Sequence, residues 1–580
     1  MPEFLHHIPP GTLMILGALL LPLLGRKSAW GALVLSLLSV VWFWLTPLGD
    51  YGEIMLFGET LNMVRIDNLS FIFGLVFHLA AVMASIYALH VEDTKQHIAA
   101  MMYAGGAIAA CCAGDLMTLF VFWELTAIAS VFLIWASGGE GAFRAGMRYL
   151  LIQVGSGVLL LSGAIIHYTE TKSLAFDHFL GLMPGETASI TDYGMGAWLI
   201  FAAFAIKCAF PLLHNWLQDS YPKATVTGTV FLSAFTTKLA IYALARGFAG
   251  TEQMITIGCI MTLFPIVFAV IENDLRRVLA YSLNNQLGFM VVGIGIGSEL
   301  ALNGTAAHAF CHIIYKALLF MSMGAVLKQA GTCKASELGG LHKSMPWTTI
   351  FCIIGAGAIS GFPLLSGFIS KSMIISAAGE EHMWGVWIVL LIASAGVMEH
   401  SGIKIPFFAF FAHDSGKRPK EAPWNMLLAM GIGAFLCIFL GVVYPLLYKI
   451  LPFPFHEGHA YAPYTNGHVV MQLQLLLFAA LAFVVLIKLK VYPAEIRSTN
   501  LDTDWVYRRL LPVAIGGLAT AYAAADTAIR NWFVGTLQRM IKMFGNDFDE
   551  KGILGRPWST NAMAVWAAIL LGVCLMLYYF

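Results

Sequence analysis

Five ionisable side chains stand in the interior of long apolar runs, where a charge is costly. They are Glu124, Lys207, Lys238, Lys316 and Lys371, and Glu399 lies near the end of a further run. A charge at the centre of a bilayer costs at least a few kcal/mol, so such residues persist where they face a partner, water or a transported ion. Lysine suits proton transfer because burial and a nearby carboxylate shift its proton affinity in opposite directions. These residues therefore predict a path for protons.

Glu124 and Lys207 lie at similar depths in their own runs, and Lys207 comes four residues before Pro211. The two side chains can meet as an ion pair in mid-membrane. Movement of Glu124 toward or away from Lys207 would load or release a proton. The alternative interpretation is a buried salt bridge with a purely structural role.

A second group lies in HAFCHIIYK, where His308, His312 and Lys316 follow one another at intervals of four residues. This spacing places the three side chains on one stripe of a helix. Histidine titrates near neutrality, which suits a relay. Two alternatives are a packing role for the histidines and a zinc site, although no third metal ligand lies nearby.

The amino-acid composition indicates the kind of protein in which these residues lie. Of 580 residues, 59% are hydrophobic and 11% are charged, with 33 basic and 33 acidic residues. Soluble proteins carry about 25% charged residues, so a water-soluble enzyme and a disordered protein are excluded. The apolar runs are continuous rather than alternating, which favours an all-α polytopic membrane protein over a β-barrel.

We expect about sixteen transmembrane helices from runs of roughly the length that crosses a bilayer. The runs are 11–24, 30–48, 67–90, 98–114, 115–137, 147–167, 195–217, 225–248, 253–272, 279–297, 303–328, 346–378, 384–402, 424–448, 470–489 and 561–580. About twenty Lys and Arg residues, Lys404 among them, fall in the odd-numbered connections, and four fall in the even-numbered ones. The positive-inside rule therefore predicts that the N-terminus is outside and the odd connections are cytoplasmic.

The stretch from 510 to 545 carries Asp526, Arg530, Gln538, Arg539 and Lys542 among apolar residues. We interpret it as an amphipathic helix that lies along the membrane or along neighbouring helices. The alternative is a span at 510–527 followed by a surface helix. The two interpretations place the C-terminus on opposite sides of the membrane.

Two short matches suggest an internal duplication. GDLMTLF at Gly114 is similar to NDLRRVL at Asn273, and AFPLL at 209–213 returns as GFPLL at 361–365. Five spans per copy would make the second copy inverted, with helix breaks at Pro211 and Pro363, which is typical of transporters. Chance similarity is the alternative. The resulting domains are 1–97, N-terminal helices; 98–252, first repeat; 253–410, inverted repeat; 411–500, C-terminal helices; and 501–580, lateral and last helices.

No cofactor or metal is expected. The nine cysteines form no C-x-x-C pair, as iron–sulfur clusters and structural zinc sites require. His456, His459 and His468 lie in a connection that we interpret as a solvated loop rather than a metal site. A redox centre of its own is disfavoured because no cofactor motif is present.

Six motifs carry a family resemblance. They are FWELTAIAS, IKCAFPLLHNWLQDSYP, SAFTTKLAIYALAR, DLRRVLAYSLNNQLG, HAFCHIIYKALLF and SGFPLLSGFISKSM. In this order they resemble the proton-translocating antiporter-like family of membrane subunits. This family includes the large membrane-arm subunits of respiratory complex I and the A-type and D-type subunits of Mrp-type Na+/H+ antiporters. ELTAIAS and SAFTTK are most similar to the D-type subunits, whereas the long tail resembles the distal complex I subunit.

The resemblance implies a role for each matching residue. Glu124 would pair with Lys207 in a first half-channel, and Lys238 would pass protons toward the centre. The path would continue through the remaining groups, His308, His312, Lys316 and finally Lys371. The resemblance also implies a bacterial inner membrane location and other integral membrane subunits as partners.

Two functions from different classes remain open. The first is an ion-translocating subunit that moves H+, alone or in exchange for Na+ or K+. The second is a membrane-arm subunit in which proton flow drives a partner, such as a complex I-like or hydrogenase-like redox arm or a bicarbonate-uptake protein. Neither function involves nucleic acid.

Overall fold

The computed structural model describes residues 3–56, 58–455, 461–496, 500 and 502–579. The chain divides into two compact units, Met1–Asp502, here called the main bundle, and Thr503–Phe580, here called the C-terminal unit. His456 and His459 of the histidine-containing loop lie outside the described residues. The expected all-α class is confirmed, since a single two-stranded sheet accompanies the helices in the described part of the chain.

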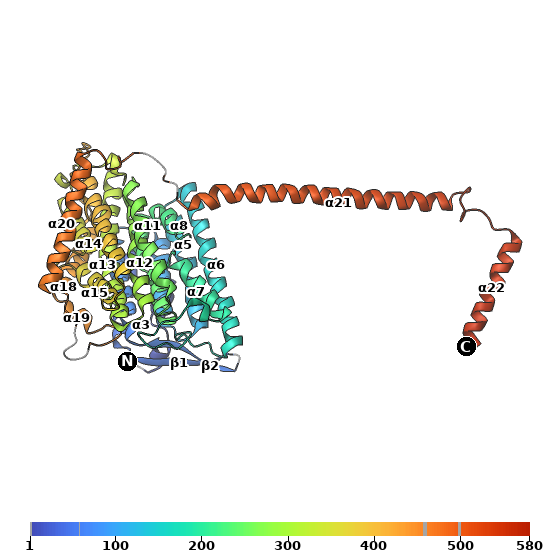
Figure 1. Ribbon diagram of the computed structural model, residues 1–580, viewed down its shortest axis with the longest axis horizontal. Helices are drawn as coiled ribbons and strands as arrows, with labels where there is room; N and C mark the ends of the chain where they lie inside the picture. The colour runs from blue at the N-terminus through green and yellow to red at the C-terminus, as the bar shows by residue number, and fades with distance from the viewer. Residues whose placement is uncertain (1–2, 57, 456–460, 497–499, 501, 580) are drawn as a thin grey trace. The chain divides into compact units, whose positions relative to one another are not determined.

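The first part of the main bundle leads from the N-terminus to the first predicted repeat. Its elements are η1 (Glu3–His7), α1 (Thr12–Ala18), η2 (Leu21–Lys27), α2 (Ser28–Leu45), β1 (Gly49–Leu56), β2 (Glu59–Ile66) and α3 (Asn68–Tyr87). The strands form an antiparallel hairpin in which Gly49 pairs with Ile66. Figure 1 shows this hairpin across one end of the helices of the main bundle.

The two predicted repeats supply the centre of the main bundle. The first contains α4 (Thr94–Cys111), α5 (Leu116–Trp135), α6 (Gly139–Thr171), η3 (Ile190–Asp192), α7 (Met195–Lys207), α8 (Asn215–Ser220), η4 (Tyr221–Lys223), α9 (Val226–Ala234) and α10 (Thr236–Gly247). The second contains α11 (Gln253–Ile271), α12 (Leu275–Ile296), α13 (Glu299–Ala330), η5 (Ala335–Glu337), η6 (Leu341–Lys343), α14 (Pro346–Ser360), α15 (Ser366–Glu380) and α16 (Trp384–Val397).

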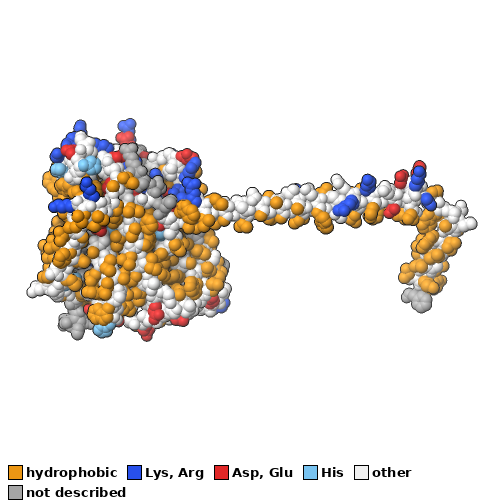
Figure 2. All heavy atoms as spheres, turned by 45° about the horizontal axis from the view of Figure 1, so that its top comes forward, with side chains coloured by type: hydrophobic (Ala, Val, Ile, Leu, Met, Phe, Trp, Pro, Cys, Tyr) orange, Lys and Arg blue, Asp and Glu red, His pale blue; other side chains and the backbone are white. Residues whose placement is uncertain are grey.

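After α16 the helix continues with two π-helical stretches before the last helices of the main bundle. The elements are η7 (Met398–Ile403), α17 (Lys404–Pro406), η8 (Phe407–Phe411), α18 (Trp424–Val442), α19 (Tyr444–Tyr448) and α20 (Asn466–Lys488). In Figure 2, apolar side chains cover the visible side of the main bundle and Lys and Arg gather toward one end. This distribution is that of a protein whose sides face lipid.

Each of the sixteen expected spans coincides with one or more helices, but the count of sixteen is not confirmed. Twelve described helices are long and apolar enough to cross a membrane, and one of them is Val506–Phe548, for which we expected a lateral position. The five remaining runs contain shorter or more polar helices. α1 has seven residues, α7 and α14 are halves of interrupted helices, α4 is rich in alanine and glycine, and α12 contains Asn284, Asn285 and Gln286.

Both predicted helix breaks are present. Pro211 lies between α7 and α8, and Pro363 lies between α14 and α15. The residue after each proline has a left-handed backbone, with φ of 70° at Leu212 and 73° at Leu364. This conformation costs an L-amino acid roughly 1–2 kcal/mol. The two FPLL sequences therefore share an uncommon backbone, which is hard to attribute to chance.

Hydrogen bonds between backbone groups support the duplication. Leu116 N donates to Leu174 O, and 159 residues later Leu275 N donates to Cys333 O, each at 2.9 Å. Gly114 and Asn273, where the sequence match begins, accept from partners related by the same offset, Phe176 N and Ala335 N. The inverted relation of the two copies and the domain boundaries stay predictions.

The C-terminal unit contains η9 (Val506–Leu510), α21 (Leu511–Phe548) and α22 (Thr560–Tyr579). α21 has 38 residues, which corresponds to a length of about 57 Å at 1.5 Å per residue. The predicted long helix is thus a single continuous helix. Its lateral placement and the alternative of an additional span both stay predictions.

Candidate proton path

The four lysines of the apolar runs are buried in the main bundle. Lys207, Lys238 and Lys316 have no exposed surface, and Lys371 is 2% exposed. None of them therefore faces lipid, which is the arrangement that the relay hypothesis requires. Burial of four ammonium groups in one protein costs several kcal/mol unless each finds acceptors or water.

Lys207 lies at the C-terminal end of α7, next to the first break. Its Nζ donates to Trp123 O at 2.7 Å and to Thr126 Oγ1 at 3.1 Å, and it lies 4.2 Å from the centre of the Trp123 ring. α5 thus holds the ammonium through a backbone carbonyl, a hydroxyl and an aromatic face.

Glu124 makes no ion pair with Lys207 in this structure, contrary to the pairing that the sequence suggested. The two charges interact through space, but Lys207 is occupied by its α5 acceptors and Glu124 Oε1 has no hydrogen-bond partner. The carboxylate instead lies against Gly157 of α6, where an added Cβ would overlap Oε1. This geometry corresponds to the separated state of the pair.

Gly157 also relates the two repeats. α6 and α13 both end at a residue with a left-handed backbone, Lys172 and Gly331, which are 159 residues apart. The same offset aligns Gly157 with Lys316. It also aligns Tyr149 with His308 and Gln153 with His312. The first repeat therefore has room for the Glu124 carboxylate at the position where the second repeat has Lys316.

Lys238 lies in the first turn of α10, just after the interruption at Phe235 that separates this helix from α9. Its Nζ donates to Ser233 O at 2.6 Å. It interacts electrostatically with His308, His312 and Lys316. Lys238 is thus placed beside the helix that carries the histidine stripe.

The predicted stripe on α13 is present and buried. The His308 and His312 rings stack with their centres 6.1 Å apart and an interplanar angle of 26°. His308 Nδ1 lies 3.0 Å from Ser370 Oγ. His308 Nε2, both nitrogens of His312 and Lys316 Nζ have no hydrogen-bond partner in the protein. Buried polar groups of this kind are ordinarily satisfied by water, so the stripe is suited to a hydrated path.

Lys371 lies on α15, just after the second break. Its Nζ donates to Ile359 O at 2.9 Å, near the end of α14. The last carbonyls of a helix lack intrahelical donors, so the break supplies the acceptor that holds the lysine. Lys371 also interacts electrostatically with His308, which brings the second break to the α13 stripe.

Sequence reasoning missed a second buried group beyond Lys371. Lys404, which we assigned to a cytoplasmic connection, has no exposed surface because the π-helical continuation of α16 carries it into the bundle. His400 is also fully buried, and Glu399 beside it is half-buried. The helical spacing of His400 and Lys404 is the signal that could have identified them.

Another missed contact joins the first break to the end of the main bundle. His214 Nε2 lies 3.0 Å from Asp502 Oδ2, and Tyr281 OH donates to the same oxygen at 3.0 Å. His214 directly precedes α8. The broken helix is therefore attached to a residue almost three hundred positions later in the chain.

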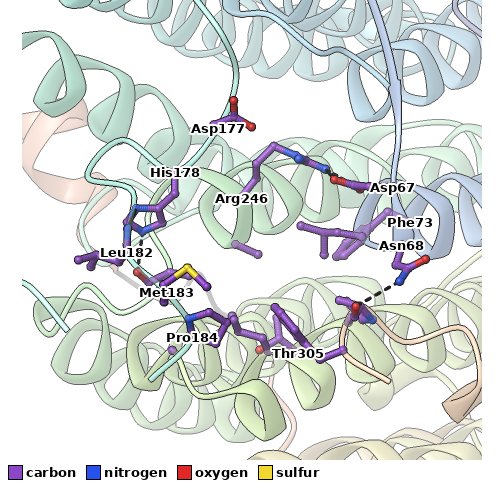
Figure 3. A pocket seen from close by; sticks show the side chains of 18 residues that line it. Asp67, Asn68, Phe73, Asp177, His178, Leu182, Met183, Pro184, Arg246 and Thr305 are labelled. Carbon is purple, nitrogen blue, oxygen red and sulfur yellow. Dashed lines mark hydrogen bonds and ion pairs between the residues drawn. The ribbon is translucent and has the colours of Figure 1, made fainter. Parts of the chain in front are cut away.

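A cavity of about 340 Å³ lies beside the start of α13 (Figure 3). Its wall includes His178, Thr305 and the ion pair in which Arg246 Nη2 donates to both carboxylate oxygens of Asp67 at 2.7 Å. Thr305 precedes His308 by three residues on the same helix face. The cavity thus begins one helical turn from the histidine stripe.

Comparisons with known proteins add an independent observation. Residues 113–397 match the family model described as NADH:quinone oxidoreductase/Mrp antiporter, transmembrane. The chain is 34% identical over 308 residues to the D-type subunit of the Na+/H+ antiporter of Alkalihalophilus pseudofirmus, covering 51% of this chain and 62% of that protein. It is 26% identical over 422 residues to hydrogenase-4 component B of Escherichia coli, covering 65% and 62%. The chain thus spans less than two thirds of the length of these relatives.

The fold has a counterpart among solved structures. It is similar to a chain in the structure of the Mrp complex from Dietzia sp. DQ12-45-1b, with a TM-score of 0.67 and 20% sequence identity. The match covers 77% of this chain and 95% of that chain. At this identity the likeness shows the shared fold.

Proposed function

Because residues 113–397 belong to the NADH:quinone oxidoreductase/Mrp antiporter transmembrane family, we propose that this chain is a proton-translocating, antiporter-like subunit of a multisubunit membrane complex. Protons move along a mid-membrane path through Glu124 and Lys207, then Lys238, then the α13 stripe, to Lys371. The subunit has no redox centre of its own. It resides in a bacterial inner membrane with its N-terminus outside.

The observation that carries the proposal is the continuity of buried titratable groups. Lys207 is followed by the buried Cys208, and Lys238 interacts electrostatically with His312 and Lys316. Lys371 reaches the same stripe through His308. A structural salt bridge accounts for one buried pair, but it does not account for a row of lysines that lack carboxylate partners.

The test measures proton movement in vesicles that contain the intact complex. We expect Lys207→Ala to abolish proton transport while the complex still assembles. Lys449→Ala, which alters an exposed lysine outside the candidate spans, is the control and should transport at the wild-type rate. Loss of assembly in Lys207→Ala, with normal transport by the fraction that does assemble, would favour a purely structural role for Lys207.

The second candidate, a subunit that couples proton flow to a partner, is favoured by the C-terminal unit. α21 offers one long helix with an apolar side, which suits attachment to a neighbouring subunit. Transport that depends on Na+ or K+ in the vesicle assay would support antiport. Transport that depends on a partner's substrate would support coupling.

A further inference from the structure

His400 is a buried histidine that the proposed path does not use. It lies in the π-helical stretch η7 and has no exposed surface. Such stretches are rare and occur frequently at functional sites. Its Nε2 is buried without a hydrogen-bond partner.

The hydrogen bonds around His400 define its tautomer. Ser401 Oγ donates to Ser282 Oγ at 2.7 Å, and this uses the one hydrogen of the Ser401 hydroxyl. The contact between Ser401 Oγ and His400 Nδ1 at 2.8 Å must then have Nδ1–H as its donor. Nε2 is therefore the bare nitrogen, which is the form that can accept a proton.

Cations from three other helices surround His400. It interacts electrostatically with Lys316 of α13, Lys371 of α15 and Lys404 of α17. Lys316 and Lys371 belong to the proposed path, whereas Lys404 does not. His400 thus lies within electrostatic range of two lysines of the path and of a further buried lysine, Lys404, one helical turn away.

Lys404, four residues after His400, is paired with a carboxylate. Its Nζ donates to Ala269 O, Val270 O and Glu272 O at 3.2, 2.6 and 2.7 Å, at the C-terminal end of α11. It also lies 2.8 Å from Glu495 Oε1, in the segment after α20. Two further carboxylates, Glu272 and Glu399, interact electrostatically with Lys404.

Glu495 adjoins a cavity at the surface of the protein, although its own side chain is buried and only 7% exposed. It lines a cavity of about 500 Å³ together with the exposed Lys490. Burial raises the pKa of the Glu495 carboxyl above its ordinary value, and the Lys404 ammonium opposes this rise. The carboxyl is therefore suited to holding a proton between the buried groups and the solvent in the cavity.

We propose that His400 is a further proton-relay group, which extends the path from Lys316 and Lys371 to the Lys404–Glu495 pair and to the surface cavity. The inference rests on the proposed function. The ammonium of Lys316 or Lys371 gives its proton to His400 Nε2, and His400 becomes an imidazolium. Lys404 gives its own proton to the Glu495 carboxylate, and the resulting amine takes the proton from the imidazolium. Glu495 then releases its proton to water, and the path lysine that began the transfer takes a new proton from the preceding group of the path, so each group returns to its starting form.

The first experiment replaces His400 by a residue that cannot titrate. In His400→Asn the amide can still donate to Ser401, so a purely structural role is largely preserved. We expect assembled complex with proton transport at least tenfold slower than wild type. The matched control is His78→Asn, because His78 is equally buried and has both nitrogens bonded, to Gly74 O and Ser39 Oγ. His400→Gln applies the same criterion if the Asn variant does not assemble.

The second experiment separates the helix-capping role of Lys404 from proton transfer. Arginine keeps the positive charge and the donors for the α11 carbonyls, but it does not release a proton in proteins. We expect Lys404→Arg to assemble and to transport at less than one tenth of the wild-type rate. Transport at the wild-type rate by both His400→Asn and Lys404→Arg would overturn the inference. The proposed function would still stand in that case if the wild-type complex transports protons and Lys207→Ala abolishes this transport. If the wild-type complex does not transport protons, the proposed function itself is refuted.

Discussion

Glu124 and Lys207 illustrate how one small residue controls the state of a buried charge pair. The carboxylate stays apart from the ammonium because Gly157 leaves room for it on α6, while Trp123 and Thr126 hold Lys207. The Glu124 carboxylate and the Lys207 ammonium are thus each held in place without direct contact with the other. The pair can therefore exchange a proton without breaking a strong salt bridge.

Gly157→Ala tests this arrangement at the residue scale. The new methyl group would displace the Glu124 carboxylate, so we expect proton transport to fall several-fold. Thermal stability should not decrease, because alanine favours a helix over glycine by roughly 0.5–1 kcal/mol. The transport rate and the melting temperature of the purified complex are the measurements.

Gly155→Ala is the matched control. Gly155 lies on the same helix, and an added Cβ there meets nothing within 4 Å. It should gain the same helix propensity and keep wild-type transport. Equal transport by the two variants would show that the space beside Glu124 is not required.

At the scale of elements, the two broken helices hold their neighbours in similar ways. Asn284 Nδ2 donates to Ala209 O at 2.9 Å in the first break, and Lys371 Nζ donates to Ile359 O at 2.9 Å beside the second. The backbone groups that the breaks leave free thus bind polar side chains. The left-handed residues Leu212 and Leu364 maintain this geometry at a cost in strain.

Leu364→Val should destabilise the second break. A β-branched side chain tolerates positive φ poorly, so we expect a loss of about 1–2 kcal/mol and a lower melting temperature. Leu364→Gly should be neutral or stabilising, because Leu364 is 58% exposed and loses little packing. Leu428→Val, in the regular helix α18 at similar exposure, is the control. Equal effects of the two valine substitutions would refute a role for backbone strain.

At the scale of the whole molecule, the chain consists of a main bundle and a separate C-terminal unit. The main bundle contains every group of the proposed path. Asp502, its last residue, is bound to His214 beside the first break. The C-terminal unit therefore begins directly after a residue that is anchored to a broken helix.

The side of α21 is tested by labelling Lys542→Cys in a Cys574→Ser background with a membrane-impermeant thiol reagent. If 510–545 lies along the cytoplasmic surface, the cysteine should react in inside-out vesicles and not in right-side-out vesicles. Lys420→Cys and Lys449→Cys serve as the inside and outside references, because both lysines are exposed in connections of opposite predicted sides. Reaction of Lys542→Cys together with Lys449→Cys would favour the additional span at 510–527.

The sequence by itself determined the class of the protein, the breaks and the first line of buried charges. An ionisable residue within an apolar run and a proline within a helix have local consequences, so Glu124, the four lysines and Pro211 could be identified without a structure. Helical periodicity likewise placed His308, His312 and Lys316 on one face.

Only the tertiary structure decided which of these groups touch and which further groups join them. The separation of Glu124 from Lys207 depends on Gly157, which lies on another helix and gives no signal in the sequence. The burial of Lys404 depends on carbonyls of α11 and on Glu495, which is 91 positions later in the chain. Such contacts follow from packing between remote segments, because the local pattern around Lys404 is the same whether its ammonium meets water or a carboxylate.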